Sequence, residues 1–213
     1  MTITIFGAKT IVGRRLVKMA LAKNYIVKAF DRNIEDLIDS DLRDDNFIAI
    51  KGYVFDKNEV LKAVKESDAI VSCIEGSKNS TDKSRSLGLK NIIEAMQKAD
   101  VNRIVAMSGI GILNYDEERL AMEMEDFPEE LKEVSSEHLI AYKYLKSTNL
   151  DWTLVCASNI IDKDFTANYE VKENYLSDQS NSNVNAGDIA DFILKVIQEK
   201  SYIKSRVGIS IKS

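Results

Sequence analysis

Residues 1–13 hold the feature that most restricts the fold of this chain. Residues 2–6 alternate along Thr-Ile-Thr-Ile-Phe and are rich in β-branched side chains, so they predict a β-strand. Gly7 follows at once, and from Ile11 onward the apolar residues recur at helical spacing. We therefore expect a strand, a tight glycine turn and a helix in immediate succession.

Such a succession is typical of the start of a dinucleotide-binding fold, where backbone N–H groups and the helix dipole face a pyrophosphate. The candidate phosphate-binding residues are Gly7, Lys9, Thr10, Ile11 and Val12. The usual pattern has glycine at the position of Thr10, and a side chain there is expected to hinder the approach of the backbone to the pyrophosphate. The Thr10 hydroxyl could compensate by bonding a phosphate oxygen. The alternative is an ordinary turn between a strand and a helix.

Predicted strands and helices alternate along most of the chain. Further strands are expected at residues 25–30, 47–50, 68–74, 103–108, 152–156 and, as the closing edge strand, 207–211. Helices are expected after a cap at Asp56, from Ser80 or Thr81 to Lys98, from about Ser135 to Lys146, and after a cap at Asn185. This alternation predicts an α/β fold with one domain over residues 1–213: a Rossmann-type, doubly wound, mainly parallel sheet flanked by helices on both faces. Ligands of such sheets bind at the carboxyl ends of the strands.

The composition of the chain argues against several classes of ligand and location. Hydrophobic residues make up 45% of the chain and charged residues 30%, as in ordinary globular proteins. The net charge of −5 argues against nucleic acid, and no apolar run approaches the ~20 residues that span a bilayer. Because no signal-peptide pattern follows Met1, we expect a cytoplasmic protein. Cys73 and Cys156 suit buried thiols, and one histidine with two distant cysteines gives no spacing for a metal site.

The acidity is concentrated in one segment. Residues 116–133 carry nine acidic and two basic side chains, or −7, so the remainder of the chain is at +2 and would not strongly repel an anionic cofactor. We expect residues 112–134 to form either a lid over the substrate or, as the favoured alternative, a surface excursion whose apolar side chains pack on the body. These apolar side chains are Leu120, Met122, Met124 and Phe127. A small C-terminal substrate lobe is expected at residues 157–185.

The end of the second predicted strand bears on the choice of cofactor. Asp31 is placed to bond the ribose 2′-OH of NAD and to repel a 2′-phosphate. Arg32 offers a guanidinium fork that suits a phosphate, and Lys9 adds a second cation in the neighbouring turn. Two cations against one carboxylate favour NADP(H) over NAD(H). The alternative is that both cations are solvated and that Asp31 selects NAD.

The run of segments resembles a known family. FGAKTIVG, AFDRN, SDAIVSC, NRIVAMSG, EHLIAYKYLKSTNLDWTLV and NAGDIADFIL are similar to the atypical short-chain dehydrogenases of the NAD(P)H-binding, NmrA-like family, and most similar to its biliverdin reductase B/flavin reductase group. The most specific piece is residues 138–155. The resemblance implies NAD(P)H-dependent reduction of a small-molecule acceptor such as a flavin, a quinone or an open tetrapyrrole. The alternative that it allows is a non-catalytic NAD(P) sensor that binds a protein partner, and a homodimer is possible in either case.

The resemblance also implies roles for residues at strand ends. Ser108, preceded by Met107, falls at the family's active-site Ser/Thr position and could orient a nicotinamide amide or a substrate carbonyl. Ser158 and Asn159 stand where the resembling reductases carry Pro-Pro-His, so a histidine proton donor is missing there; Ser158 is assigned to cofactor binding and Asn159 to catalysis. The groove between adenosine and nicotinamide is expected to be lined by Cys73, Ile74 and Glu75.

A Tyr-x-x-x-Lys pair, the usual acid and base of short-chain dehydrogenases, occurs at Tyr142 and Lys146. In the family's register the equivalent positions fall near Ser135 and Leu139, which cannot do this chemistry, so we treat the pair as a chance match. His138 is the single histidine. We expect it to have a capping or structural role at the start of a helix.

Overall fold

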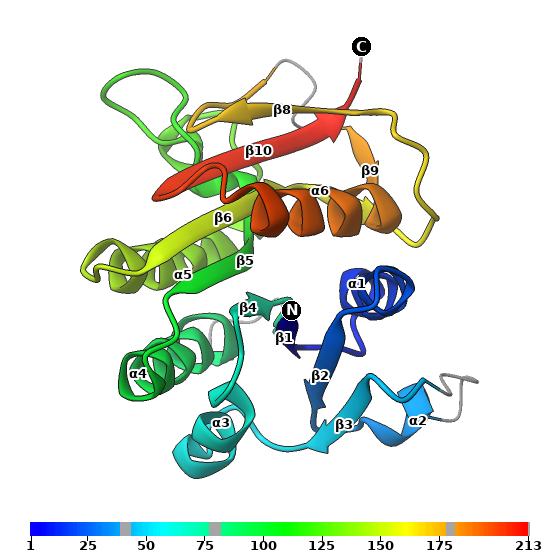
Figure 1. The fold of residues 1–213 in the computed structure, drawn as a ribbon. Coiled ribbons are helices and arrows are strands. Elements are labelled where there is room, and N and C mark those ends of the chain that lie inside the picture. The colour runs from blue at the N-terminus through cyan, green and yellow to red at the C-terminus, as the bar shows by residue number, and fades with distance from the viewer. Residues whose placement is uncertain (39–43, 77–81, 178–181, 213) are drawn as a thin grey trace.

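The computed structural model describes residues 1–38, 44–76, 82–177 and 182–212 (Figure 1). Its main feature is an eight-stranded sheet in the order β3-β2-β1-β4-β5-β6-β10-β8. β8 is antiparallel to β10, and the other described pairings in this sheet are parallel. The strands are β1 (Thr2–Phe6), β2 (Ile26–Asp31), β3 (Phe47–Lys51), β4 (Ala69–Ser72), β5 (Arg103–Gly109), β6 (Asp151–Ala157), β8 (Tyr169–Glu173) and β10 (Ser205–Ile211), with β7 (Asn159–Ile161) and β9 (Asn183–Asn185) in a small separate sheet.

Helices cover both faces of the large sheet (Figure 1). One face is covered by α1 (Ile11–Ala22) and α6 (Ala186–Glu199), which lie side by side, and the other by α3 (Lys57–Val64), α4 (Leu89–Ala99) and α5 (Glu129–Lys146). The short α2 (Glu35–Ile38) follows β2. Each face has its own apolar core, because strand side chains alternate between the two sides. The predicted doubly wound α/β fold is confirmed.

The strand order reverses at β1, which has β2 on one side and β4 on the other. In the parallel register Phe6 is paired with Phe30 on β2 and with Ser72 on β4. The carboxyl ends of these three strands therefore meet beside the turn that starts at Gly7. A crevice at such a reversal point is the usual ligand site of an open parallel sheet.

The prediction for the last strand was wrong in one respect. β10 is not the edge of the sheet but lies between β6 and β8, and its residues from Ser205 to Ser210 are buried. The edge is formed by β8, which pairs antiparallel with β10 and leaves its last two residues exposed. Local sequence could not show this, because the pairing joins segments more than thirty residues apart.

Two helices begin elsewhere than predicted. α5 begins at Glu129, six residues before the expected Ser135, directly after Pro128. Proline is well accommodated at the start of a helix, and the negative charges of Glu129 and Glu130 in the first turn interact favourably with the helix dipole. The proposed caps Ser80 and Thr81 lie outside the described residues; the described helix there is a π-helical turn, η1 (Ser84–Gly88), that leads into α4.

The two predicted N-caps differ in outcome. The Asp56 carboxylate accepts hydrogen bonds from the N–H groups of Asn58 and Glu59, so this cap of α3 is confirmed. Asn185 precedes α6, but its side chain does not cap the helix. The amide of Asn185 instead donates to Asp188 Oδ2 at 3.0 Å, because the buried Asp188 carboxylate also holds the loop at Thr166.

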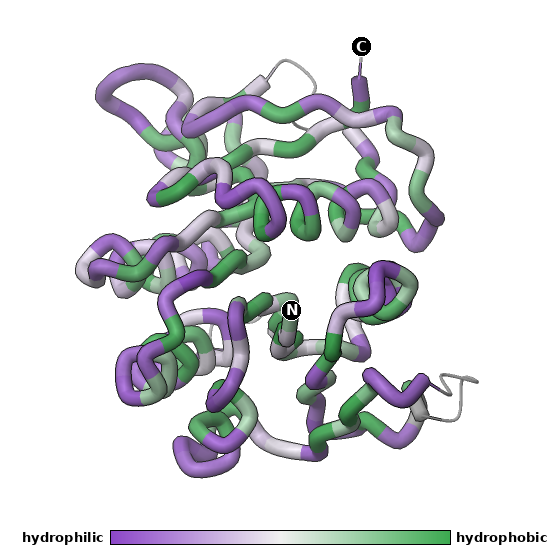
Figure 2. The backbone as a smooth tube through the Cα atoms, in the orientation of Figure 1, coloured by the Kyte–Doolittle hydropathy of each residue, from purple (hydrophilic) through white to green (hydrophobic). Residues whose placement is uncertain are grey.

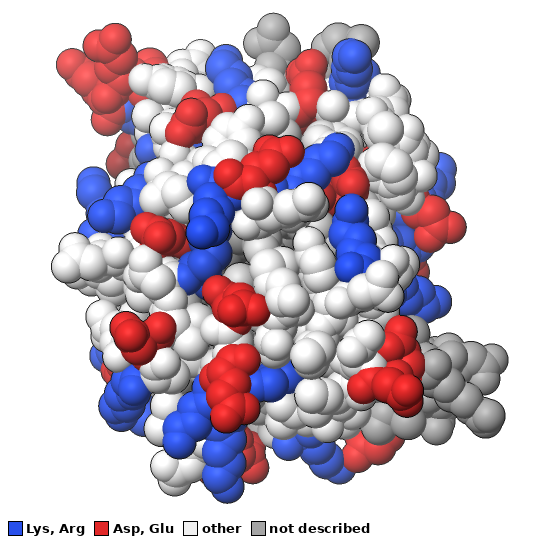
Figure 3. All heavy atoms as spheres, in the orientation of Figure 1, with Lys and Arg blue, Asp and Glu red and all other residues white. Residues whose placement is uncertain are grey.

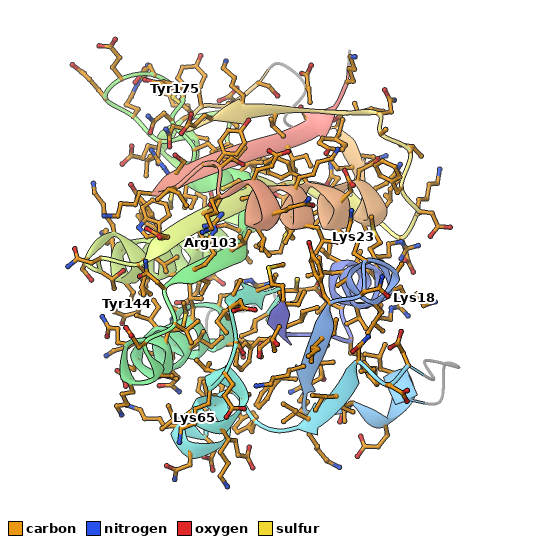
Figure 4. All side chains as sticks on the ribbon, in the orientation of Figure 1. Lys18, Lys23, Lys65, Arg103, Tyr144 and Tyr175 are labelled. Carbon is orange, nitrogen blue, oxygen red and sulfur yellow. The ribbon has the colours of Figure 1, made fainter. Side chains whose placement is uncertain are left out.

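Arg103, labelled in Figure 4, is the first residue of β5, whereas the turn at Gly7 follows the last residue of the parallel strand β1. Its buried guanidinium donates to the carbonyl oxygens of Asp151, Val196 and Ser201 and to the hydroxyl of Thr153. Burial lowers the pKa of Arg103 to about 10, so it is still charged at neutral pH. It therefore joins the starts of β5 and β6 to the end of α6 and has a structural role.

The acidic segment forms an excursion after β5 (Figure 1), hydrophilic at its outer end (Figure 2), where acidic side chains gather (Figure 3). It contains two 3₁₀ turns, η2 (Ile110–Ile112) and η3 (Ala121–Glu123). Met122 and Met124 pack against the core beneath α4 and α5, and Phe127 is buried. No helix in the described residues is long and apolar enough to span a membrane.

Candidate functional site: two adjoining cavities

A cleft of about 520 Å³ opens at the carboxyl ends of β1, β2 and β4. Its walls come from the turn after β1, the end of β2, the segment after β3 and the segment after β4. The lining includes the exposed ring of Tyr53 and the buried aromatic residues Phe6 and Phe30. Its polar residues are Lys9, Thr10, Asp31, Arg32, Asn33, Glu75, Asp82 and Ser84. Aromatic surface beside charged groups suits the adenosine end of a dinucleotide.

Gly7 makes the turn at the floor of this cleft possible. Its φ of +73° is in the left-handed region, which side chains rarely adopt. A Cβ at Gly7 would lie 2.6 Å from the carbonyl oxygen of Cys73. The Gly7 N–H donates to the carbonyl of Phe30 at 3.1 Å, so the turn is fixed between β2 and β4.

Thr10 is turned into the start of α1. Its hydroxyl accepts from the N–H of Gly13 at 3.0 Å and donates to the carbonyl of Gly7, also at 3.0 Å. Thr10 therefore N-caps the helix, and this engaged hydroxyl is not left to bond a phosphate. The N–H groups of Ile11 and Val12 have no acceptor among the hydrogen bonds of the described residues, as expected at a helix start. They form the cradle that an anion would fill.

Asp31 ties the same turn to the end of β2. Its carboxylate accepts from the backbone N–H of Lys9 at 3.2 Å and from that of Asn33 at 3.1 Å. Much of its hydrogen-bonding capacity is thus used inside the protein, although a carboxylate can accept further bonds. Arg32 is exposed at the rim of the cleft, whereas Lys9 is half-buried.

A second cavity of about 250 Å³ adjoins the first, with which it shares Thr10, Ile74 and Glu75. It lies at the ends of β5 and β6 and under the first half of α5. Besides the shared Thr10 and Glu75, its polar lining includes Arg85, Ser108, Ser135, His138, Ser158 and Asn159. Its apolar lining includes Ile110, Phe127, Leu131, Val134 and Ile160. The two cavities therefore lie next to each other between the end of β2 and α5.

Close contact between β5 and α5 shapes the second cavity. A Cβ at Gly109 would lie 3.0 Å from Cδ2 of His138, and one at Gly111 would lie 2.7 Å from Cβ of Ser135. Because neither glycine has a side chain, His138 and Ser135 of α5 can pack closely against the backbone at and just after the end of β5. Ser135 and His138 are one helical turn apart and line the same cavity.

A charged cluster closes the side of the cavity next to η1. The guanidinium of Arg85 donates to the carbonyl of Gly76 at 2.7 Å. Behind it, the buried Glu137 pairs with Lys83 at 2.7 Å and accepts a hydrogen bond from Ser86. These contacts fasten the π-helical turn to α5. Turns of this kind often occur at functional sites.

Comparison with known proteins identifies the family. A family model described as NAD(P)H-binding matches residues 7–200, which include both cavities. The chain belongs to this NAD(P)H-binding family. Among curated proteins none matches.

Solved structures share the fold of this NAD(P)H-binding protein. A protein of Burkholderia pseudomallei, provisionally described as exported, is 25% identical with a TM-score of 0.83, and 99% of each chain is covered. A protein of Streptococcus pneumoniae TIGR4, provisionally assigned as an NADH-flavin reductase, is 21% identical with a TM-score of 0.83 over 100% of both chains. A wide-type short-chain dehydrogenase/reductase of Veillonella parvula DSM 2008, solved with NADP, is 15% identical with a TM-score of 0.78, covering 98% of this chain and 94% of that one.

In this NAD(P)H-binding protein, the residues predicted for the site all lie near the two cavities. The first cavity is lined by Gly7, Lys9, Asp31 and Arg32. The second is lined by Val12, Cys73, Met107, Ser108, Ser158 and Asn159. Both are lined by Thr10, Ile74 and Glu75. Ile11 adjoins them in the first turn of α1. Burial raises the pKa of the Cys73 thiol far above its usual value, so this residue lines the wall as a neutral thiol.

Sequence analysis misplaced His138 along its helix. It lies in the middle of α5, not at its start, and it faces the second cavity. Arg85, Ser135 and Tyr53 were not predicted for the site, and Phe127 was expected there only under the alternative in which residues 112–134 form a lid. Helical spacing from Leu131 to His138 could have pointed to this face of α5, but only with the correct start of the helix.

The discounted pair Tyr142 and Lys146 lies outside both cavities. The Tyr142 ring packs edge-on against Trp152, with ring centroids 5.7 Å apart, and the guanidinium of Arg206 lies 4.9 Å from its centroid. Lys146 is 5.8 Å from the same ring. These contacts give Tyr142 a structural role.

His138 should make stability depend on pH. Burial, with a smaller contribution from Arg85, lowers its pKa in the fold from 6.5 to about 3. As the pH falls, the unfolded chain binds a proton at His138 that the folded chain does not bind. The contribution of His138 to the free energy of unfolding is therefore fully present above pH 6.5 and is lost as the pH falls toward 3. Between pH 7 and pH 5 we expect wild type to lose about 1 to 2 kcal/mol more than H138Q. Urea unfolding at both pH values measures this, and equal losses in the two proteins would contradict it.

Proposed function

We propose that this chain is an NAD(P)H-dependent reductase that transfers a hydride to a planar acceptor such as a flavin or a quinone. The observation that carries the proposal is the pair of adjoining cavities at the reversal point of the sheet. The larger one has the aromatic and charged lining that suits adenosine, and the smaller, mostly apolar one suits the flat face of an acceptor.

The residues at the turn after β1 are suited to hold the cofactor. The N–H groups of Ile11 and Val12 would face the pyrophosphate, with the dipole of α1 behind them. Thr10 supports this role as the cap that keeps the first turn of α1 in place. When bound, the reduced nicotinamide supplies the hydride.

The residues of the second cavity are suited to orient an acceptor. Ser108 lies near the end of β5, and Asn159 follows the end of β6, the strand that pairs with β5. Both residues line the second cavity, where their side chains could bond a nicotinamide amide or an acceptor carbonyl. The apolar side chains of Phe127 and Leu131 exclude water from the same space. A flavin or quinone can take its proton from water, so no Tyr-Lys pair is required.

We further propose that residues 112–134 and 157–185 serve as the acceptor-side elements of one domain. Phe127, from the first segment, and Asn159, from the second, line the same cavity. Arg14 of α1 binds Asp162 at 3.1 Å, which joins the second segment to the helix of the phosphate site. This arrangement is consistent with a place near the NmrA-like and biliverdin reductase B/flavin reductase group.

The cofactor is expected to be NADPH in preference to NADH. Lys9 and Arg32 line the first cleft, and a guanidinium bonds a phosphate strongly. At equal concentrations NADPH should raise Tm more than NADH, and R32A should lose most of the difference through a roughly tenfold weaker Kd for NADPH. Lys23→Ala, which removes an exposed cation at the far end of α1, is the matched control. No shift of Tm with either cofactor would refute cofactor binding.

Turnover separates a reductase from a sensor. The purified chain should oxidise NADPH steadily, followed at the nicotinamide absorbance, when FMN or menadione is added. Cofactor binding without oxidation across a panel of flavins and quinones would favour the non-catalytic sensor.

A further inference from the structure

The wall of the second cavity formed by α5 has one strongly polar position. Leu131, Val134, Ser135 and His138 face the cavity at helical spacing. The first two are apolar and Ser135 is buried against Gly111. His138 therefore brings the main hydrogen-bonding side chain of this helix into the cavity.

Backbone packing fixes the place of the His138 ring. A Cβ at Gly109 would lie 3.0 Å from Cδ2 and 3.4 Å from Nε2 of His138, so the imidazole rests against bare backbone at the end of β5. The same strand end carries Ser108, which lines the cavity. The ring thus lies at the end of β5, next to Ser108, in the part of the second cavity proposed to hold the acceptor.

Burial, aided by the positive charge of Arg85, keeps the His138 ring neutral. Arg85 faces it from η1, and Glu75 lies at the end of β4 in the same cavity. Glu137, the neighbour on α5, is occupied by Lys83 and Ser86. The low pKa of His138, caused first by burial and then by Arg85, leaves an uncharged imidazole at neutral pH. One ring nitrogen then donates a hydrogen bond and the other accepts one.

We infer that His138 is the polar anchor of the acceptor, hydrogen-bonding a carbonyl or aromatic ring nitrogen on the buried edge of a planar molecule in the second cavity. The inference rests on the proposed function. The apolar side chains of Phe127 and Leu131 would pack on the flat face of the acceptor, while the hydrogen bond from the imidazole fixes the position of its edge. His138 selects and orients the acceptor through this hydrogen bond and does not act as a proton donor in the reaction.

The single histidine permits a direct test by NMR. The full chain, labelled with ¹⁵N-histidine and saturated with NADP⁺ so that no turnover occurs, is titrated with menadione. We expect the imidazole resonances to report a neutral ring and to shift when menadione is added. Unchanged imidazole resonances at saturating menadione would overturn the inference. This readout does not depend on catalysis, so it remains decisive even if NADPH oxidation fails and the proposed function falls.

Variants give the second test. H138F, which keeps a flat ring but removes both hydrogen-bonding nitrogens, should raise KM for menadione about 10- to 30-fold with the Kd of NADPH unchanged, and H138Q should restore part of the loss. Ile140→Gln, at an exposed position on the same helix, is the matched control and should behave as wild type. An unchanged KM in H138F would contradict an anchoring role.

Discussion

Replacing Gly7 by alanine is expected to destabilise the fold by about 2 to 4 kcal/mol and to weaken cofactor binding at least about tenfold. Two physical causes act together. A side chain at φ +73° is strained, and its Cβ would lie 2.6 Å from the backbone oxygen of Cys73, which cannot rotate away. Relief requires the turn to move, and with it the first N–H groups of α1.

Urea unfolding and titration of NADPH by its fluorescence measure the two effects of Gly7→Ala. Gly88→Ala is the matched control, because its methyl group would meet the Val54 side chain at 3.1 Å at a helical backbone position. That side chain can shift, so little change is expected. Wild-type stability and affinity in Gly7→Ala would show that the turn is not rigid.

Replacing Gly111 by alanine is expected to cost about 2 to 3 kcal/mol and to impair the use of acceptors while sparing cofactor binding. The added Cβ would lie 2.7 Å from Cβ of Ser135 and 3.0 Å from Cζ of Phe127. Since α5 must then move away from β5, the wall of the second cavity moves with it. The cleft between β2 and β4 has no contact with this position, so the Kd of NADPH should hold.

A double-mutant cycle tests this explanation. S135G removes the Ser135 atoms that the new methyl group would meet, and leaves its contact with Phe127. Glycine inside a helix costs about 1 kcal/mol by itself. The double variant of Gly111→Ala and S135G should therefore be about 1 to 2 kcal/mol more stable than the sum of the single effects predicts. Strict additivity in urea unfolding would mean that the destabilisation does not arise from contact with α5.

The cofactor half of the site follows from sequence more fully than the acceptor half. Gly7, Thr10 and Asp31 come from two consecutive strand ends, and parallel pairing of neighbouring strands brings such ends together. The acceptor half depends on how α5 is rotated and where it starts. Sequence analysis began this helix six residues late, and so placed His138 at its start.

Thr10 shows the same limit within a well-predicted segment. The residue type and its place in the turn predicted either an obstructing side chain or a phosphate ligand. The structure shows a third arrangement, in which the hydroxyl caps α1 by accepting from the N–H of Gly13. The N–H groups of Ile11 and Val12 are then left for an anion. The competing principle was helix capping, which threonine satisfies at the position where the family usually has glycine.

By itself the sequence determined the strand, turn and helix at residues 2–22 and the alternation that makes a parallel sheet, because hydrophobic periodicity and glycine turns are local properties. Only the tertiary structure decided that β10 lies inside the sheet, that Asp31 holds the turn at Lys9, and that His138 faces the second cavity. Each of these depends on contacts between residues far apart in the chain. For His138 the deciding contact is its packing on Gly109, which places the ring in the acceptor cavity.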